Sequence, residues 1–144
     1  MTVAAILKHK GYDVVSVDPT ARIDAVAALL SERRIGAVLV LDSADQLLGI
    51  VSERDLVTSL AANGARTLEM SAGQLMTRAL HIVTPQTTEV EAMTVMTASR
   101  VRHLPVVERG ALIGMISIGD VVKARIMQQD HEVDSLRAYV AGAT

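Results

Sequence analysis

The sequence predicts an α/β fold made of two β-α-β-β-α repeats that pack on each other and share a core. The first observation is a duplicated motif: residues 49–55 read Gly-Ile-Val-Ser-Glu-Arg-Asp, and residues 114–120 read Gly-Met-Ile-Ser-Ile-Gly-Asp. The second is that the upstream residues also match, because Val-Asp-Pro at 17–19 answers Val-Thr-Pro at 83–85. An internal duplication fixes the architecture of the whole chain. Because each copy alone is marginal in size, we expect one shared core.

In the first repeat, valines at 14, 15 and 17 predict a short strand that ends at Asp18-Pro19. Apolar residues at 23, 26, 27 and 30 then lie on one face of a predicted helix. Two strands follow at 37–41 and 47–51, joined by a hairpin turn. The last helix of the repeat begins at Ser52 and ends at Asn63-Gly64, where glycine suits a helix terminus.

The second repeat follows the same order, with a predicted strand at 81–83 and a helix introduced by the capping box Thr88-Glu89-Val90-Glu91. Strands at 104–107 and 111–116 form its hairpin. We therefore divide the chain into a first repeat (1–64), a linker (65–73), a second repeat (74–125) and a C-terminal helical extension (126–144).

The last predicted helix runs from about Ser117 to Gly142 and carries apolar residues in a seven-residue pattern. Ile126, Val133 and Val140 recur at sevens, and Val122, Gln129 and Leu136 occupy the other position of the pattern. This spacing fits a narrow contact with a partner helix. It also fits a surface helix that folds back on its own domain, and this second interpretation is favoured.

Composition excludes several classes of function. The net charge is −2, which predicts no nucleic-acid partner, and no apolar run is long enough to cross a membrane. The N-terminus has no signal pattern, and the chain has no cysteine, so a cytoplasmic protein is expected. The only aromatic residues are two tyrosines. Any planar ligand would therefore lie between aliphatic side chains.

The duplicated Gly-x-x-Ser-x-x-Asp motif carries the strongest chemical signal. A single copy would be read as a helix cap, because serine is a preferred N-cap and an acidic residue suits the first turn. The same geometry also suits a ligand, since a helix N-terminus offers N–H groups to a phosphate and an aspartate can accept bonds from two ribose hydroxyls. Two equivalent copies favour the ligand-binding interpretation.

Together these motifs resemble a tandem pair of CBS domains, also called a Bateman module, of the kind found in small stand-alone bacterial proteins. Further matching segments are residues 34–37 and 102–106 and the prolines at 19 and 85. The resemblance covers roughly residues 3–125. It implies a pseudo-twofold module with two clefts between the repeats, which in many relatives bind AMP, ADP, ATP, NAD(H) or S-adenosylmethionine.

By this resemblance, Asp55 and Asp120 would contact ribose, and Ser52 and Ser117 would lie near phosphate. The second site is expected to be the better one, because basic residues surround its motif and would complement a phosphate. The residues assigned to the two sites are Ser117, Ile118, Gly119, Asp120, Arg100, Arg102, His103, Pro105, Lys123, Ser52, Arg54, Asp55 and Lys8.

His103 is expected to be a phosphate contact or an ordinary strand residue, since no other histidine has ligand spacing with it. Met93 and Met96 are expected to fill the core, and the threonines at 77, 84, 87 and 88 to serve caps and turns. No metal site is predicted. No catalytic motif is recognised either, so we do not expect an enzyme.

The expected function is regulatory binding of an adenine nucleotide (AMP, ADP, ATP or NAD(H)), in the manner of an energy sensor, with no required cofactor. The expected partners are a second copy in a homodimer and an unidentified protein. The alternative is an assembly or interaction protein that binds no ligand and acts through its dimer faces and C-terminal helix.

Overall fold

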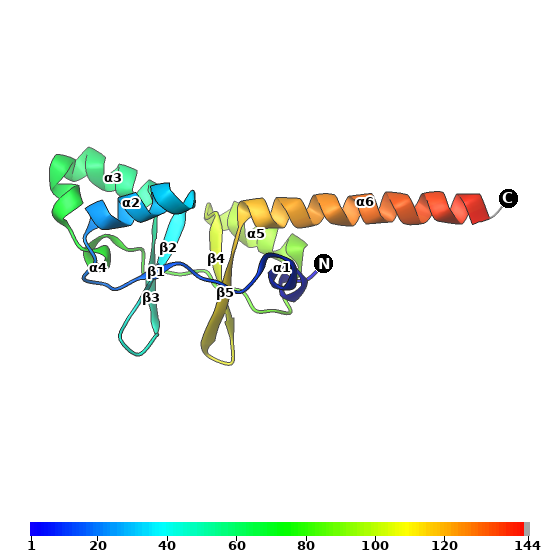
Figure 1. The fold of residues 1–144 in the computed structure, drawn as a ribbon, viewed down its shortest axis with the longest axis horizontal. Helices are drawn as coiled ribbons and strands as arrows, with labels where there is room; N and C mark the ends of the chain where they lie inside the picture. Colours follow the sequence, from blue (N-terminus) through cyan, green and yellow to red (C-terminus); the bar gives the residue numbers. More distant parts are fainter. Residues whose placement is uncertain (143–144) are drawn as a thin grey trace. The chain divides into compact units, whose positions relative to one another are not determined.

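The computed structural model describes residues 1–142 and has the predicted α/β fold with two repeats. The chain forms two compact units (Figure 1). One unit comprises Asp13–Leu80 and contains the first motif; we name it the Asp55 unit. The other comprises Met1–Tyr12 and His81–Thr144 and contains the second motif; we name it the Asp120 unit.

The Asp55 unit contains a three-stranded sheet in the order β1-β2-β3. Strand β1 (Ser16–Val17) runs parallel to β2 (Ala37–Leu41), and β2 pairs with β3 (Leu47–Ser52) in antiparallel fashion. Helix α2 (Ile23–Arg33) connects β1 to β2, and α3 (Glu53–Asn63) follows β3. Strand β2 consists only of aliphatic residues, and its first four residues are buried, as expected of a strand in the core. The core of the unit is formed by Ile23, Val26, Leu30, Val38, Val40, Val51, Ala72 and Met76.

The segment between the repeats is folded. A 3₁₀ helix, η1 (Gly64–Glu69), packs against α3, and the hydroxyls of buried Thr67 and Ser59 lie 2.8 Å apart. Helix α4 (Ala72–Leu75) follows, with Ser71 and Gln74 forming a capping box. Residues 65–73 therefore belong to the packed body of the Asp55 unit.

The Asp120 unit contains an antiparallel hairpin of β4 (His103–Glu108) and β5 (Ala111–Ser117). Helix α5 (Glu89–Ser99) precedes the hairpin and begins with the predicted capping box at Thr88 and Glu91. The strand predicted at 81–83 is reduced to an isolated parallel bridge between Val83 and Val106. The bridge is not extended because the chain turns at once, with the Thr87 N–H donating to the Thr84 carbonyl.

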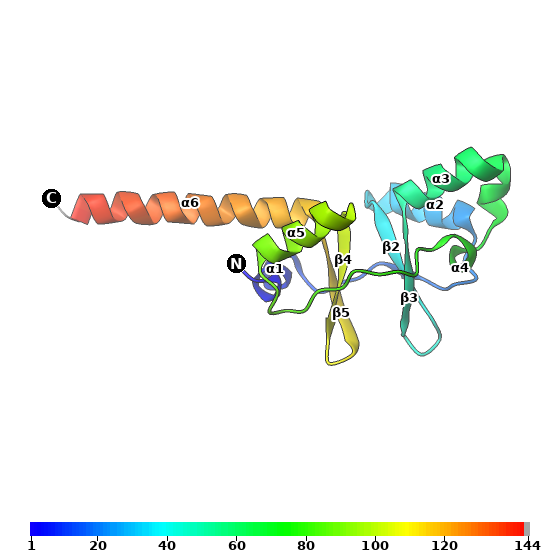
Figure 2. The same cartoon turned by 180° about the vertical axis from the view of Figure 1, so that it is seen from behind.

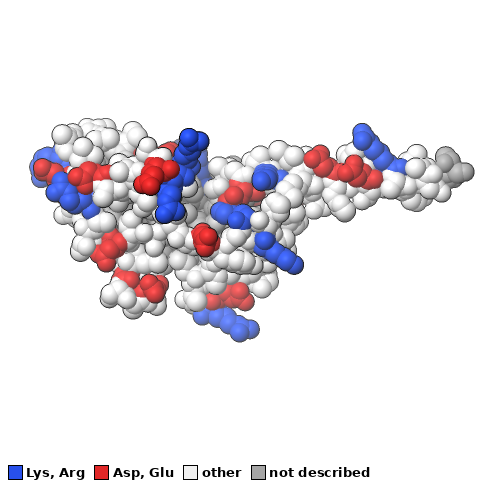
Figure 3. All heavy atoms as spheres, viewed as in Figure 1, with Lys and Arg blue, Asp and Glu red and all other residues white. Residues whose placement is uncertain are grey.

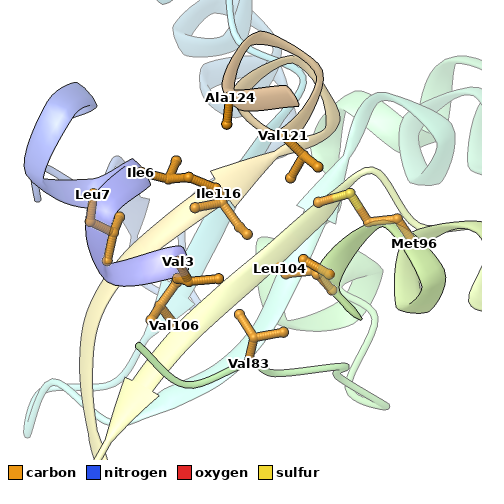
Figure 4. Packing of buried hydrophobic residues seen from close by; sticks show 11 residues of the cluster. Val3, Ile6, Leu7, Val83, Met96, Leu104, Val106, Ile116, Val121 and Ala124 are labelled. Atoms are coloured by element: carbon orange, nitrogen blue, oxygen red, sulfur yellow. The ribbon is translucent and has the colours of Figure 1, made fainter. Parts of the chain in front are cut away.

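Helix α1 (Val3–Lys10) completes the core of the Asp120 unit, although it belongs to the beginning of the chain. Figure 4 shows Val3, Ile6 and Leu7 of this helix packed toward Ile116 of β5 and its neighbours. The two units are built alike in this respect. Residues that precede the second repeat complete the Asp55 unit, and residues that precede the first repeat complete the Asp120 unit. Each unit is thus completed by the segment that leads into the other repeat.

Helix α6 (Ile118–Gly142) packs on the Asp120 unit only through its beginning, where Val121 and Ala124 are buried. Figures 1 and 2 show its later turns extending past β4, β5, α1 and α5. The interpretation that this helix folds back on its own domain is wrong. Val133, Leu136 and Val140 are 47%, 63% and 56% exposed, so the described parts of their unit leave them uncovered.

Candidate functional site

Both motifs place a serine and an aspartate at the beginning of a helix. At α3, the Asp55 N–H donates to Ser52 Oγ over 3.3 Å, and the Ser52 N–H donates to Asp55 Oδ2 over 2.8 Å. At α6, the corresponding distances between Asp120 and Ser117 are 3.2 and 2.8 Å. The reciprocal bonds orient each carboxylate in the first turn, where the helix dipole favours a negative charge.

The neighbouring strand meets each motif in the same way. Ala37 pairs with Ser52 and His103 pairs with Ser117 in the two hairpins. The first N–H of each helix donates to the carbonyl of the preceding residue on that strand, Gly36 in one unit and Arg102 in the other, over 2.9 and 2.8 Å. Arg102 and His103 therefore occupy the positions that Gly36 and Ala37 hold beside the first motif, as the repeat alignment predicts.

Asp120 forms an ion pair with a residue of α1. Lys10 Nζ lies 2.7 Å from Asp120 Oδ2 and also donates to the Met115 carbonyl over 2.9 Å. Partial burial raises the pKa of Asp120, but the hydrogen bonds from Lys10 and Ser117 and the charge of Lys10 outweigh it. The net result is a pKa below the ordinary aspartate value, so the group is an anion at neutral pH.

A pocket of about 360 Å³ lies beside this ion pair, between α1 and α6. The volume falls within the range of about 300–1,000 Å³ that is typical of small-molecule sites. His9, Lys10 and Lys123 supply basic groups around it, and Asp120 supplies the carboxylate. Its apolar lining comes from Met1, Ile6, Ala124 and Met127. The pocket therefore combines aliphatic walls with groups that suit both a hydroxyl-bearing and an anionic ligand.

Asp55 is hydrogen-bonded by a neutral side chain, where Asp120 is paired with a charged lysine. Thr77 Oγ1 donates to Asp55 Oδ1 over 3.0 Å, and Ser52 Oγ donates to Asp55 Oδ2 over 3.0 Å. An open groove of about 690 Å³ beside α2 and α3 is lined chiefly by apolar side chains such as Leu30, Leu56 and Val57, and Asp55 is not part of its lining. The two aspartates thus differ in their partners, because a neutral hydroxyl donates to Asp55 and a charged ammonium group donates to Asp120.

The other predicted site residues are distributed between the two units. Ile118 and Gly119 fill the first turn of α6, Pro105 is buried in β4, and Arg100 ends α5 in a left-handed conformation with φ 55°. Arg54 is exposed in the first turn of α3. Lys8 was expected to serve the first motif, but it lies exposed on α1 in the Asp120 unit. The structure does not bring Lys8 into one unit with Ser52 and Asp55.

Sequence reasoning missed two residues that contact the motif aspartates, Lys10 and Thr77. A signal for Thr77 was present, because residues 6–8 mirror residues 75–77 in the repeat alignment, whereas Lys10 lies beyond this match. The alignment did not reveal that each leading segment packs with the other repeat. Thr77, to which only a cap or turn role was assigned, binds Asp55 directly.

The described part of the chain holds neither a metal-binding cluster nor a helix that could span a membrane. Residues 1–142 contain no cluster of three or more histidine, aspartate or glutamate side chains that could hold a metal ion. Among the helices of the same residues, none combines the length and the apolar character needed to cross a membrane.

Two similar proteins have been solved with a nucleotide. One is the CBS domain protein PAE2072 from Pyrobaculum aerophilum complexed with AMP, with a TM-score of 0.73 and 26% identity, over 83% of this chain and 89% of that chain. CBSX2 was also crystallised in complex with AMP, with a TM-score of 0.72 and 29% identity, over 89% and 98% of the two chains.

Other similarities are stronger. The CBS-domain containing protein ATU1752 from Agrobacterium tumefaciens has a TM-score of 0.84 and 45% identity, over 86% of this chain and 92% of that chain. CBS domain-containing protein CBSX3, mitochondrial, from Arabidopsis thaliana is 34% identical over 151 residues, which is 98% of this chain and 72% of that protein. The model of the CBS domain matches twice, at residues 3–62 and 72–127. With both repeats matched and the motifs in corresponding places, this chain belongs to the CBS-domain family.

Proposed function

We propose that this protein is a regulatory module that binds an adenine nucleotide and converts its occupancy into a change of conformation or of partner affinity. The observation that carries the proposal is the pocket beside Asp120, with its carboxylate, its three basic groups and its aliphatic walls. The AMP complexes of PAE2072 and CBSX2 support an adenine nucleotide as the ligand class.

In this proposal, Asp120 binds the ribose hydroxyls through Oδ1, since its bonds to Lys10 and to the Ser117 N–H both use Oδ2. Lys10, Lys123 and His9 complement the phosphate. The partial positive charge at the beginning of α6 adds to this positive region. The adenine ring lies against aliphatic side chains, because aromatic side chains are nearly absent from the chain.

In this proposal, ligand binding weakens or rearranges the Lys10–Asp120 ion pair. A phosphate near Lys10 competes with Asp120 for the ammonium group, and a ribose near Asp120 competes with Lys10 for the carboxylate. Since Lys10 lies on α1 and Asp120 on α6, binding alters the bond that joins these two helices. A ligand regulates only through such a difference in affinity between two states.

Titration calorimetry on the full chain with AMP, ATP and NADH tests this proposal. We expect at least one of them to release heat with a stoichiometry near one or two per chain. AMP is compared with 2′,3′-dideoxy-AMP, which lacks both hydroxyls. We expect the dideoxy compound to bind roughly tenfold more weakly, because hydrogen bonds to a charged carboxylate are among the stronger ones. No heat from any nucleotide would overturn the proposal.

Mass spectrometry of the protein purified without added ligand gives an independent answer, since a co-purifying nucleotide identifies the ligand directly. The same samples test for catalysis. We expect ATP and NADH to remain intact after prolonged incubation, and turnover would show an enzyme instead. A cytoplasmic location, a homodimer and a further protein partner remain predictions of the sequence.

A further inference from the structure

The exposed part of α6 carries a continuous apolar seam that lacks any cover from the described residues of its own unit. We define the seam as the positions that follow the seven-residue pattern along this helix. Its aliphatic members are between 43% and 63% exposed, which is unusual for side chains aligned on one face. The seam consists of Val122, Ile126, Gln129, Val133, Leu136 and Val140.

The seam points away from the face by which α6 packs on its unit. At about 100° per residue, its centre lies roughly 120° around the helix from Val121 and Ala124. A helix can therefore approach the seam without displacing the core of the Asp120 unit. Figures 1 and 2 show that this part of α6 extends beyond the other elements of the unit.

The helical state of this extension also needs an explanation. A short isolated helix is marginal in water, and most helices in proteins are stabilised by packing of an apolar face. Residues 129–142 are all exposed, so they receive little such packing from their own unit. A partner along the seam would supply it.

We propose that the partner is α6 of a second copy of this chain, packed against the seam as a parallel, in-register two-stranded coiled coil. In heptad notation, Ile126, Val133 and Val140 are a positions, and Val122, Gln129 and Leu136 are d positions. The combination of β-branched residues at a and leucine at d favours two parallel strands. Here all three a positions are β-branched, and Leu136 supplies the leucine at one of the three d positions.

The flanking charges support the parallel arrangement. In a parallel pair, each g residue meets the e residue five positions later on the other helix. Glu132 at g then faces Arg137 at e of the second copy, and Arg125 at g faces Asp130 at e. Both pairs are of opposite charge. Figure 3 shows acidic atoms and, nearer the C-terminus, basic atoms on the projecting part of the helix.

Two of these residues also have bonds within their own chain. Arg125 Nη1 lies 3.4 Å from Glu89 Oε1, and Glu132 Oε1 accepts from Gln128 over 3.3 Å. Arginine has five N–H donors and a carboxylate can accept several bonds, so these contacts leave capacity for the second copy. Because Arg125 also pairs with Glu89 of its own chain, the Arg125–Asp130 pair gives the weaker support. The Glu132–Arg137 pair is therefore the main charge evidence for the parallel arrangement.

An antiparallel pair of helices would bring like charges together. The register that keeps the whole seam paired sets Val133 of one helix against Gln129 of the other. It then brings Glu132 near Glu132 and Asp130 near Asp130 of the second copy, and Lys123 near Arg137. Like charges at these places are unfavourable. The charge pattern therefore selects the parallel orientation.

Gln129 is the polar member of the seam, and it fixes the register. In the parallel in-register dimer, the two Gln129 amides face each other and can hydrogen-bond. Any shift along the helix sets an amide against an aliphatic side chain, which is costly because the amide loses its partner. The seam is separate from the groups proposed to bind nucleotide, so this inference stands or falls apart from that proposal.

The test compares self-association of the full chain and its variants by analytical ultracentrifugation over a range of concentrations. We expect the wild-type chain to form dimers, and Val133→Asp/Leu136→Asp to associate roughly tenfold or more weakly, since two buried aliphatic residues are lost. Ser135→Asp adds a charge on the outer face of the same helix and should associate like the wild type.

Val57→Asp tests the alternative that the dimer forms through another exposed surface, because Val57 is 65% exposed on α3 in the Asp55 unit. A wild-type chain that stays monomeric would overturn the proposal. So would a dimer that is lost with Val57→Asp and retained in the seam variant. AMP titration of each variant separates the two proposals, since the seam variants should bind AMP as the wild type does.

Orientation is tested in two further ways. Glu132→Arg should weaken the dimer, and Glu132→Arg/Arg137→Glu should restore it, because the double change reverses both charges of the pair. Since the chain has no cysteine, Gln129→Cys introduces a single thiol. Oxidation should join two Gln129→Cys chains by a disulfide, and Ser135→Cys chains should stay unlinked. Failure of Gln129→Cys to cross-link in a dimeric sample would exclude the parallel register.

Discussion

Lys10 Nζ lies 2.7 Å from Asp120 Oδ2, although the two residues are 110 positions apart in the chain. The bond joins the first helix to the second motif and helps to hold α1 in the Asp120 unit. Asp55 accepts a corresponding hydrogen bond from the neutral hydroxyl of Thr77. The two motifs, so similar in sequence, therefore differ in the residue that meets their aspartate.

Removing the Lys10 ammonium group in Lys10→Met should raise the pKa of Asp120. Partial burial, which raises this pKa, remains, while the bond and charge of Lys10, which lower it, are lost. An NMR titration of the Asp120 carboxyl carbon measures the change directly. Lys8→Met is the control, because Lys8 is exposed on the same helix and has no part in the ion pair.

Lys10→Met should also lower the free energy of unfolding at neutral pH. A carboxyl group whose pKa is lowered in the folded state stabilises the protein above its unfolded pKa of about 3.9. This contribution is lost as the pH falls through the lower folded pKa. Lys10→Met should therefore cost up to about 1 kcal/mol of unfolding free energy at pH 7, after allowance for solvent screening. A difference from the wild type that persists unchanged at low pH would contradict this account.

The two aspartates should contribute unequally to nucleotide binding. We expect Asp120→Ala to weaken AMP binding by roughly tenfold or more and Asp55→Ala to weaken it less, because the basic groups lie around Asp120. Calorimetry measures both affinities. Glu91→Ala controls for the loss of a helix cap, since Glu91 occupies the same capping position on α5. An equal loss of AMP affinity in the two variants, or a larger loss in Asp55→Ala, would contradict this ranking of the two sites.

The two strand glycines should tolerate alanine differently. A Cβ at Gly49 would lie 2.7 Å from Met76 Sδ and 2.8 Å from the backbone carbonyl of Thr77, whereas at Gly114 it would lie 2.9 Å from Leu7 Cδ2. A side chain can move more easily than a backbone carbonyl. Both substitutions should destabilise by about 1–3 kcal/mol, with Gly49→Ala the larger.

Urea unfolding at neutral pH compares these variants. Gly119→Ala is a control of opposite sign: its Cβ would meet only Ser117 Oγ at an ordinary 3.6 Å. Alanine in place of a helical glycine should stabilise α6 by up to about 1 kcal/mol. A smaller cost for Gly49→Ala than for Gly114→Ala would show that the Thr77 backbone can yield.

Elements with strong local signals could be predicted from the sequence. The caps at Ser52 and Thr88 were found because a hydroxyl followed three residues later by an acidic group specifies a helix start almost by itself. The hairpin strands were found because short aliphatic runs flank turn residues. The identity of the two motif aspartates likewise follows from the repeat alone.

Features that depend on distant contacts could not be predicted in this way. The sequence shows that residues 6–8 mirror 75–77, but the same apolar pattern can pack on either repeat. Lys10 and Thr77 were missed for that reason. The strand at 81–83 was overestimated, because its length depends on the Thr84–Thr87 turn. The direction of α6 was misjudged, since one apolar stripe fits either a fold-back or an open extension.

The position of Asp120 in the first turn of α6 has a mechanical consequence. The helix is 25 residues long, so at a rise of about 1.5 Å per residue it reaches roughly 37 Å. It is held at its base by the Asp120 unit and by the Lys10 ion pair. A tilt of about 5° there moves the far end by roughly 3 Å, by the geometry of a straight rod of that length. The helix is thus a lever arm, and Lys10 and Asp120 sit at its fulcrum.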